Sequence, residues 1–292
     1  MSRVEGGLEG ADGAVLTRDD LPLAERLDAR LDQVAGLRYQ HLCPAANLHM
    51  GAALAALERF RAEREARTGV RLGLTAPLVR AAALALEEAP LLACLFDGRD
   101  RLVPAEHPAL GVSVDTGDAA RCLVLERARG LGLEELAVRI REAAARFRAE
   151  AAPAFRRAAP GAAPAGARRR RLAHLLAREV RERFAYLLPG EVERRFAGHA
   201  ARQGHFTVHN LGALGVDEFK GFLRRPALAA LWALTAQRRV VRGPDGRYAG
   251  ERRLPLVLIF SQDLVPLDQA CAFLRGIVRR IEQPVSLLEG AP

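Results

Sequence analysis

Apolar residues recur every three or four positions over several stretches of the chain, a spacing typical of amphipathic helices. The stretch that begins at Thr75 carries a hydroxyl residue suited to an N-cap and has Pro77 in its first turn, where a missing N–H costs least. We therefore predict helices over residues 21–37, 52–67, 75–88, 133–147, 172–186, 191–202 and 266–281.

Shorter apolar runs, bounded by turn residues, predict β-strands between these helices. They cover residues 101–103, 110–114, 121–126, 205–210, 228–235 and 254–260, and residues 38–50 have the pattern of an extended segment. Gly-Pro-Asp-Gly at residues 243–246 is a strong hairpin turn. Because helices and strands are interspersed without strict alternation, we predict a mixed α/β fold (α+β-like), with a sheet covered by helices.

Composition delimits the domain. Residues 1–16 are Gly-rich and acidic and predict a flexible tail, and residues 17–292 have the length of a single domain. Within it, an Arg- and Ala-rich insert at about residues 150–203 interrupts the pattern. Twelve arginines and four glutamates in residues 151–203 leave a surplus of eight, nearly the whole net charge of +9.

Charge and cysteine usage exclude several classes of protein. Aromatic residues form only 5% of the chain and no nucleic-acid-binding module is recognisable, so we do not expect nucleic-acid binding. No stretch approaches the ~20 apolar residues of a membrane span, and the N-terminus lacks the apolar core of a signal peptide. The four cysteines are scattered, without metal-ligand spacing. We expect a cytoplasmic protein with no metal site and no membrane association.

Five segments, in this order, resemble the catalytic domain of the dihydrolipoamide acyltransferases of 2-oxoacid dehydrogenase complexes. L-T-A-P-L-V-R-A-A-A-L-A-L-E-E-A-P resembles the long helix of that family and its following turn, and A-L-G-V-S-V-D-T-G resembles a family strand. H-F-T-V-H-N-L-G-A-L-G-V-D-E-F is similar to the "F-T-I-S-N-L-G" segment, and S-Q-D-L-V-P-L-D-Q falls where the family carries "D-H-R-x-x-D-G". I-E-Q-P-V-S-L-L resembles the family's C-terminus. The resemblance covers residues 20–148 and 204–289.

The resemblance implies a chloramphenicol acetyltransferase-like fold, assembled as a homotrimer with active sites between subunits. Leu287 and Leu288 resemble the hydrophobic anchor that joins family trimers into larger cages. A coenzyme A thioester would be the acyl donor. The sequence shows no lipoyl domain and no lysine in a lipoyl-type hairpin, so we expect no lipoyl group on this chain.

In the family, the histidine of "D-H-R-x-x-D-G" is the general base, and the hydroxyl of "S-N-L-G" on a neighbouring subunit helps to hold the oxyanion. Here Asp263 and Asp268 keep their spacing, but Leu264 replaces the histidine and Gln269 the glycine. Leucine cannot transfer a proton, so the family mechanism cannot operate unchanged. The second aspartate of the motif is linked in the family to an N-terminal arginine. Asp268 therefore either pairs with Arg26 or Arg30 or caps the last helix.

At the serine position this chain has His209, followed by the family's Asn210. Two interpretations follow. In the first, His209 supplies the base from the other side of the inter-subunit channel, since an imidazole of near-neutral pKa suits that task. Ser261, Gln262 and Gln269 are then available as oxyanion or substrate donors, beside the carboxylates of the motif. In the second, the site has decayed and His209 is only a polar residue on a strand.

The sequence thus supports two functions. One is an acyltransferase that moves an acyl group from coenzyme A or a carrier-protein thioester to a small hydroxyl, amine or thiol acceptor. The other is a catalytically inactive relative that persists as an oligomeric scaffold. The Arg-rich insert is either a solvated flap or borders the cofactor entrance, where arginine suits phosphate.

Overall fold

The structure is a computed structural model of the 292-residue chain. The structure describes residues 8–9, 15–16, 45–96, 102–116, 120–157, 191–221, 223, 226–242 and 245–289. The predicted helices over residues 21–37 and 172–186, His41, Cys43, His174 and both candidate arginine partners of Asp268 lie outside these ranges. Two short strands, β1 (Leu8–Glu9) and β2 (Val15–Leu16), pair antiparallel within the stretch predicted as a tail.

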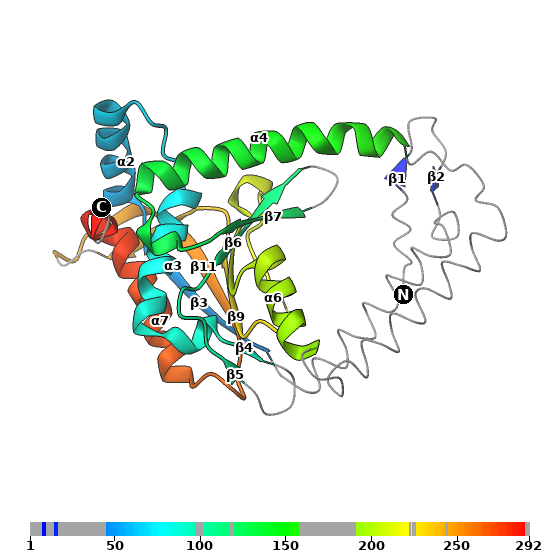
Figure 1. Cartoon of the computed structure of the whole chain (residues 1–292). Coiled ribbons are helices and arrows are strands. Elements are labelled where there is room, and N and C mark those ends of the chain that lie inside the picture. The colour runs from blue at the N-terminus through cyan, green and yellow to red at the C-terminus, as the bar shows by residue number, and fades with distance from the viewer. Residues whose placement is uncertain are drawn as a thin grey trace, which may run out of the picture.

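A mixed seven-stranded sheet forms the centre of the molecule, as predicted (Figure 1). Its strand order is β10-β11-β9-β8-β6-β7, and β3 pairs with β11 on that strand's other edge. Parallel pairing joins β8 to β6 and to β9, and all other pairs are antiparallel. The strands are β3 (Ala45–Ala53), β6 (Leu110–Asp115), β7 (Ala120–Leu125), β8 (Phe206–Asn210), β9 (Ala229–Ala233), β10 (Gln237–Arg242) and β11 (Tyr248–Ser261). A separate pair consists of β4 (Leu95–Phe96) and β5 (Leu102–Val103).

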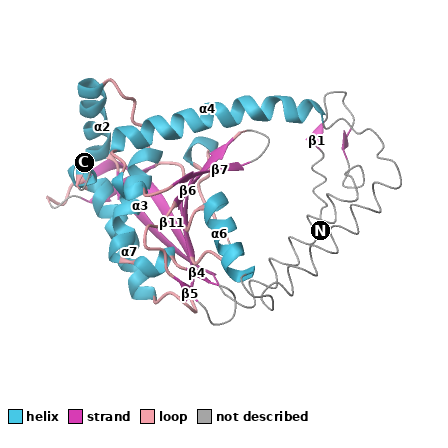
Figure 2. Ribbon diagram, viewed as in Figure 1, coloured by secondary structure: helices cyan, strands magenta, loops and turns pink. Residues whose placement is uncertain are grey.

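Helices cover the sheet unequally (Figures 1 and 2). On one face, α3 (Thr75–Glu88) and α7 (Leu267–Glu282) pack beside each other, with α2 (Ala55–Thr68) and α4 (Leu133–Arg157) at their upper end. On the other face, α6 (Glu191–Gln203) lies against β6 and β7. Short 3-10 turns occur at residues Pro90–Ala93, Ala128–Gly130, Gly212–Leu214 and Pro284–Leu288 (η5).

Burial explains why these segments form these elements. Every residue of α3 from Ala76 to Leu86 is buried, and all but Arg80 are apolar, as expected for a helix enclosed by the rest of the fold. On α7 the buried residues follow helical spacing, and they form one stripe against the sheet. In β11, Leu256, Leu258 and Phe260 enter the main core, whereas Val257 and Ile259 join a second apolar cluster on the opposite face. The central strand of the sheet is therefore buried on both faces.

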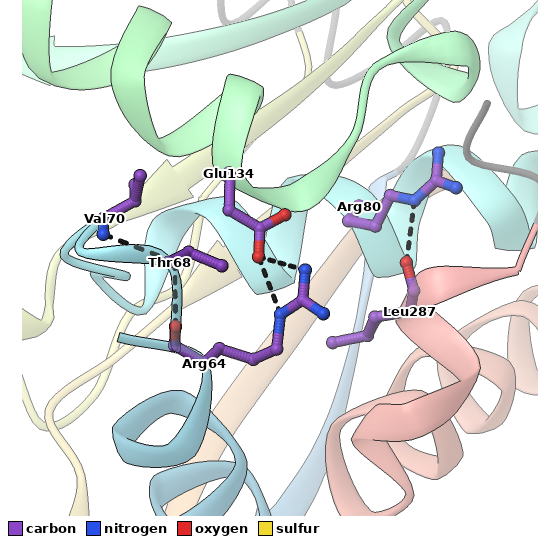
Figure 3. A network of polar contacts seen from close by, with 6 residues as sticks. All are labelled: Arg64, Thr68, Val70, Arg80, Glu134 and Leu287. Carbon is purple, nitrogen blue, oxygen red and sulfur yellow. Dashed lines mark hydrogen bonds and ion pairs between the residues drawn. The ribbon is translucent and has the colours of Figure 1, made fainter. Parts of the chain in front are cut away.

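Two arginines tie the helical layer together (Figure 3). Arg64 on α2 donates to Glu134 on α4. Arg80 on α3 is fully buried, and its Nε donates to the Leu287 carbonyl at 3.0 Å while its other nitrogens reach the carbonyls of Arg129 and Glu289. Leu287 itself is 0% exposed. The structure thus buries in its own protomer a leucine that the sequence suggested as an anchor between trimers.

Several boundaries differ from the sequence prediction. The predicted helix over residues 52–67 begins only at Ala55, because Ala52 and Ala53 pair with β11. The helix over residues 133–147 continues to Arg157, into the predicted insert. Residues 237–242 form a strand that the sequence analysis did not predict. Among the described residues, no helix is long and apolar enough to cross a membrane.

Candidate active site

His209 lies near the end of β8, on the sheet face opposite α3 and α7. Its ring stacks flat on Trp232 of the same protomer, with the centroids 4.4 Å apart and the planes 8° from parallel. The two residues are register partners in the parallel β8–β9 pair. Phe219 stacks near Trp232 at 5.3 Å, so a short aromatic array fixes the imidazole. Neither aromatic partner was identified from the sequence, since Trp232 meets His209 only through strand register.

Burial of the imidazole sets its protonation. Desolvation lowers the pKa of His209 to about 4 from the usual 6.5. The ring is therefore neutral at pH 7, with a free lone pair but little basicity. This corrects the expectation of a near-neutral pKa.

Asn210 anchors the turn that follows His209. Its Nδ2 donates to Thr75 Oγ1 at 3.0 Å, and its Oδ1 accepts from the Gly212 N–H at 3.0 Å. The Thr75 hydroxyl is thus used across the fold and makes no cap hydrogen bond; the N-cap position is Leu74, so the predicted capping role is wrong. Both functions of the Asn210 side chain are structural in the protomer, and they hold the β8 end against the start of α3.

The Asp-Leu-Val-Pro-Leu-Asp-Gln loop joins β11 to α7. Leu264 is partly buried and packs against the main core, so it contributes volume where the family carries a base. Asp263 and Asp268 are exposed, and within the described ranges neither forms an ion pair. Pro266, and not Asp268, is the N-cap residue of α7, and Asp268 lies in the first turn of the helix, where a carboxylate is favourable for the helix dipole.

Polar side chains flank this loop. Gln262 and Gln269 are exposed. Ser261, in contrast, is 2% exposed, and its Oγ has no hydrogen-bond partner in the described part of the chain. An unpaired buried hydroxyl costs free energy. Because the Ser261 side chain has almost no exposed surface, it does not present a donor to a substrate in this protomer, contrary to the expectation from the sequence.

The structure does not bring the two halves of the predicted site together within one protomer. Trp232, the partner of His209, pairs with Val257, and Ser261 lies four residues further along β11. At about 3.3 Å per residue and about 4.8 Å per strand, His209 and Ser261 are roughly 16 Å apart. The loop that carries Asp263 and Asp268 lies beyond Ser261. A single protomer therefore cannot present the imidazole and this loop to one reacting centre.

The other titratable residues form no second site. His49 and His107 are exposed. His205 is partly buried, and its Nδ1 accepts from the Ala109 N–H at 3.1 Å. On α6, desolvation and then the charge of Arg202 lower the pKa of His199 to about 4. Among the described residues there is no group of three potential metal ligands.

Cys94 and Cys122 have the chemistry of inert thiols. Cys94 is buried, and Cys122 and Cys271 are partly buried. Burial raises the pKa of the Cys122 thiol to about 11, and it also raises that of Cys94. Neither is a thiolate at neutral pH, so neither suits nucleophilic catalysis.

Solved structures show which class of fold this is. A probable dihydrolipoamide acetyltransferase from Listeria monocytogenes superposes with a TM-score of 0.65 at 18% identity, covering 94% of this chain and 96% of that chain. The dihydrolipoamide acetyltransferase of Azotobacter vinelandii gives 0.67 at 19%, covering 95% and 96%. A truncated 2-oxoacid dehydrogenase complex core from Thermoplasma acidophilum gives 0.61 at 18%, covering 88% and 95%. The chain has the acyltransferase core fold.

The family follows from the sequence. The family model of the 2-oxoacid dehydrogenases acyltransferase (catalytic domain) matches residues 26–154 and 176–289, so the chain belongs to this family. The unmatched stretch, residues 155–175, is shorter than the insert delimited from composition, because the match includes α6. Comparison with curated protein sequences gave no match.

Proposed function

We propose that this chain catalyses acyl transfer from a coenzyme A or carrier-protein thioester to a small acceptor, at a site shared between protomers, with His209 as the proton acceptor. The acceptor hydroxyl, amine or thiol attacks the thioester carbonyl while His209 takes its proton. The tetrahedral intermediate then collapses, and the thiolate of the donor leaves with a proton from the imidazolium.

The observation that carries this proposal is the placement of His209. It occupies the family's "S-N-L-G" position, its ring is fixed by Trp232, and the following Asn210 retains a rigid connection to α3. A pKa of about 4 makes His209 a weak base that is always deprotonated at neutral pH. We therefore expect the acid limb of the rate profile near pH 4 rather than near pH 6.5.

The rest of the site would come from a second protomer, since the Ser261–Gln269 segment lies at the far end of the sheet. The exposed carboxamides of Gln262 and Gln269 are free to contact substrate there. Asp263 and Asp268 are free to pair across the boundary. The cubic core of a pyruvate dehydrogenase multienzyme complex has the same fold and is an assembly of many subunits, which supports self-association here. We propose a homotrimer, with or without further assembly.

A relative's residues support the choice of positions. The Azotobacter structure concerns the roles of a serine, a histidine and an asparagine in catalysis, the last two four residues apart. Leu264 and Asp268 have that same separation here. The chain thus lacks the histidine of this arrangement, and a different residue must accept the proton if transfer occurs.

The second candidate is a catalytically inactive oligomer, favoured by Leu264. Its side chain packs on the core at the family's base position, where it excludes a proton carrier. Nothing then requires His209 to contact substrate, and its stacking on Trp232 would be packing alone.

Purified protein, its oligomeric state measured by sedimentation, should be assayed with acetyl-CoA against a panel of hydroxyl, amine and thiol acceptors, including dihydrolipoamide. His209→Ala removes the proposed base, and His49→Ala is the matched control because His49 belongs to the same cross-strand row, paired with Val257. Turnover lost in the first variant and kept in the second supports the transferase. Oligomers without turnover for any acceptor support the inactive scaffold.

A further inference from the structure

Trp232 covers one flat side of the His209 imidazole and is itself held in place. The two rings are 4.4 Å apart between centroids and within 8° of parallel. Trp232 is only 8% exposed, and it belongs to the apolar cluster that includes Val257 and Ile259, both 0% exposed. Because these side chains enclose the indole, we expect it to stay against the imidazole when the imidazole gains a charge.

The turn after β8 presses a second ring onto the indole. Phe219 stacks on Trp232 with centroids 5.3 Å apart and planes at 25°. Two residues further on, the Gly221 N–H donates to Asn47 Oδ1 on β3 at 3.2 Å, which ties the turn to the sheet. A Cβ at Gly221 would lie 2.8 Å from the Phe219 ring and 2.7 Å from Ile259 Cδ1, so a glycine is needed for this close packing. The indole is thus fixed from behind as well as from the side.

The nitrogen atoms of the His209 ring remain open while its face is covered. Within the described residues, neither nitrogen forms a hydrogen bond, and neither is among the fully buried polar atoms that lack a partner. Both therefore keep some accessible surface, whereas Nε2 of His199 is fully buried and unpaired. The His209 imidazole can exchange a proton without leaving Trp232.

No charged side chain of the described residues stabilises a protonated His209. Burial alone lowers its pKa to about 4, without a contribution from any charged neighbour. The charged side chains on the adjoining segments are all exposed: Asp115 on β6, Arg202 on α6, and Asp217, Glu218 and Lys220 in the turn after β8. In many histidine bases a buried carboxylate orients the ring and stabilises the imidazolium. Within this protomer His209 has an indole beside it and no such carboxylate.

An indole face can perform part of that task. The face of an aromatic ring is negative, and it attracts a cation that lies within about 6 Å of the ring centre, most strongly when the pair is desolvated. An imidazolium stacked at the observed distance meets this condition, and the neutral imidazole gains less from the same contact. The indole should therefore offset part of the cost that burial imposes on the protonated ring.

We propose that Trp232 is the positioning residue of His209, whose indole both fixes the imidazole and stabilises the imidazolium that forms when His209 accepts a proton. The part of this inference that concerns catalysis rests on the proposed acyl transfer. The stabilisation of the imidazolium is a property of the two rings and can be measured without turnover.

The test changes the charge distribution of the indole and leaves its shape almost unaltered. Trp232 is the only tryptophan of the 292-residue chain, so replacing tryptophan by its mono-, di- and trifluorinated analogues alters this ring alone. Fluorine withdraws electron density from the ring face and weakens its attraction for a cation. Protonation of His209 is followed by NMR of histidine labelled at Cε1, and its signal is assigned by its loss in His209→Gln.

We expect the pKa of His209 to fall with each added fluorine, with a total loss of proton affinity of about five- to thirtyfold. His199 is the matched control, because desolvation also lowers its pKa to about 4 but it lies on α6, outside the ring stack. Its pKa should stay constant along the series. A constant pKa of His209, or equal shifts of the two histidines, would overturn the role of Trp232.

Activity gives an independent measurement. In an active protein, kcat should fall along the fluorine series while KM for the acceptor stays constant, because the indole contacts the base and not the substrate. Trp232→Phe, which keeps a smaller aromatic face, should retain more of kcat than Trp232→Leu, which keeps only bulk. If no acceptor is turned over, the proposed transferase fails, and the NMR series still decides whether Trp232 stabilises the imidazolium. Turnover that requires His209 but does not respond to fluorine would keep His209 as the base and overturn the role of Trp232.

Discussion

Acid should destabilise this protein through His209, and His209→Phe should remove that part of the effect. The pKa of His209 is about 4 in the folded chain and about 6.5 when exposed, so the folded state disfavours the protonated ring. As the pH falls below about 6.5, the unfolded chain takes up a proton that the folded chain does not. The stability that the neutral ring contributes is complete above this value and is lost progressively toward pH 4.

The magnitude follows from these two pKa values. At about pH 5 the unfolded imidazole is almost fully protonated and the folded one hardly at all, which corresponds to about 2 kcal/mol; the full difference, below pH 4, is about 3 kcal/mol. Phenylalanine retains a flat ring for stacking on Trp232 and does not titrate. Urea unfolding of both proteins at about pH 7.5 and pH 5 gives the difference directly.

Carboxylates and His199 also titrate in this range, but they are common to both proteins and cancel in the comparison. His107→Phe is the control, since it makes the same exchange at an exposed position. Equal pH dependence in wild type and His209→Phe would refute the burial of the imidazole. A variant that loses more stability in acid than wild type would instead place a carboxylate beside the ring.

Two substitutions test the packing that positions the site. Arg80→Met removes three hydrogen bonds to backbone carbonyls, including that of Leu287. It should lower the free energy of unfolding, measured with urea, by about 2–4 kcal/mol and expose the C-terminus to proteolysis. A variant as stable as wild type would contradict the role assigned to Arg80. Gly111→Ala would place a Cβ 2.0 Å from the Gln203 carbonyl oxygen and should displace the end of α6. We expect the free energy of unfolding in urea to fall by about 1–3 kcal/mol and hydrogen exchange in α6 to become faster. Gly130→Ala, which meets nothing within 4 Å, is its control, and protection of α6 as in wild type would show that the contact is not tight.

Much of the fold could be predicted because local pattern and burial agree. The boundaries predicted for α3 were confirmed, since the segment is apolar except at Arg80 and its two C-terminal glutamates, and Pro90 follows its end. Where the local sequence pattern conflicts with the tertiary environment, pairing between strands determines the secondary structure. Ala52 and Ala53 favour a helix by propensity, yet they extend β3 because Leu254 and Arg253 lie opposite them in β11. β10 escaped prediction because its polar ends obscure the strand pattern.

The candidate site could be predicted only as a set of positions. Motif spacing identified His209, Asn210 and the loop with Leu264, but nothing in the sequence indicates that Trp232 lies against the imidazole. That contact depends on the register of two parallel strands, which end and begin 19 positions apart in the chain, at Asn210 and Ala229. The pKa of His209 could not be predicted for the same reason, since it results from burial and not from neighbouring charges.

Two of the departures from the family pattern, the lost base at Leu264 and the gained imidazole at His209, lie on different elements near opposite ends of one sheet. At roughly 16 Å between His209 and Ser261, a proton taken by the imidazole has no direct route to the Asp263 loop of the same protomer. One substitution can therefore compensate the other only across a boundary between protomers. It follows that an active transferase built on His209 is obligatorily oligomeric and should lose activity on dilution below its assembly constant. An inactive scaffold makes no such demand.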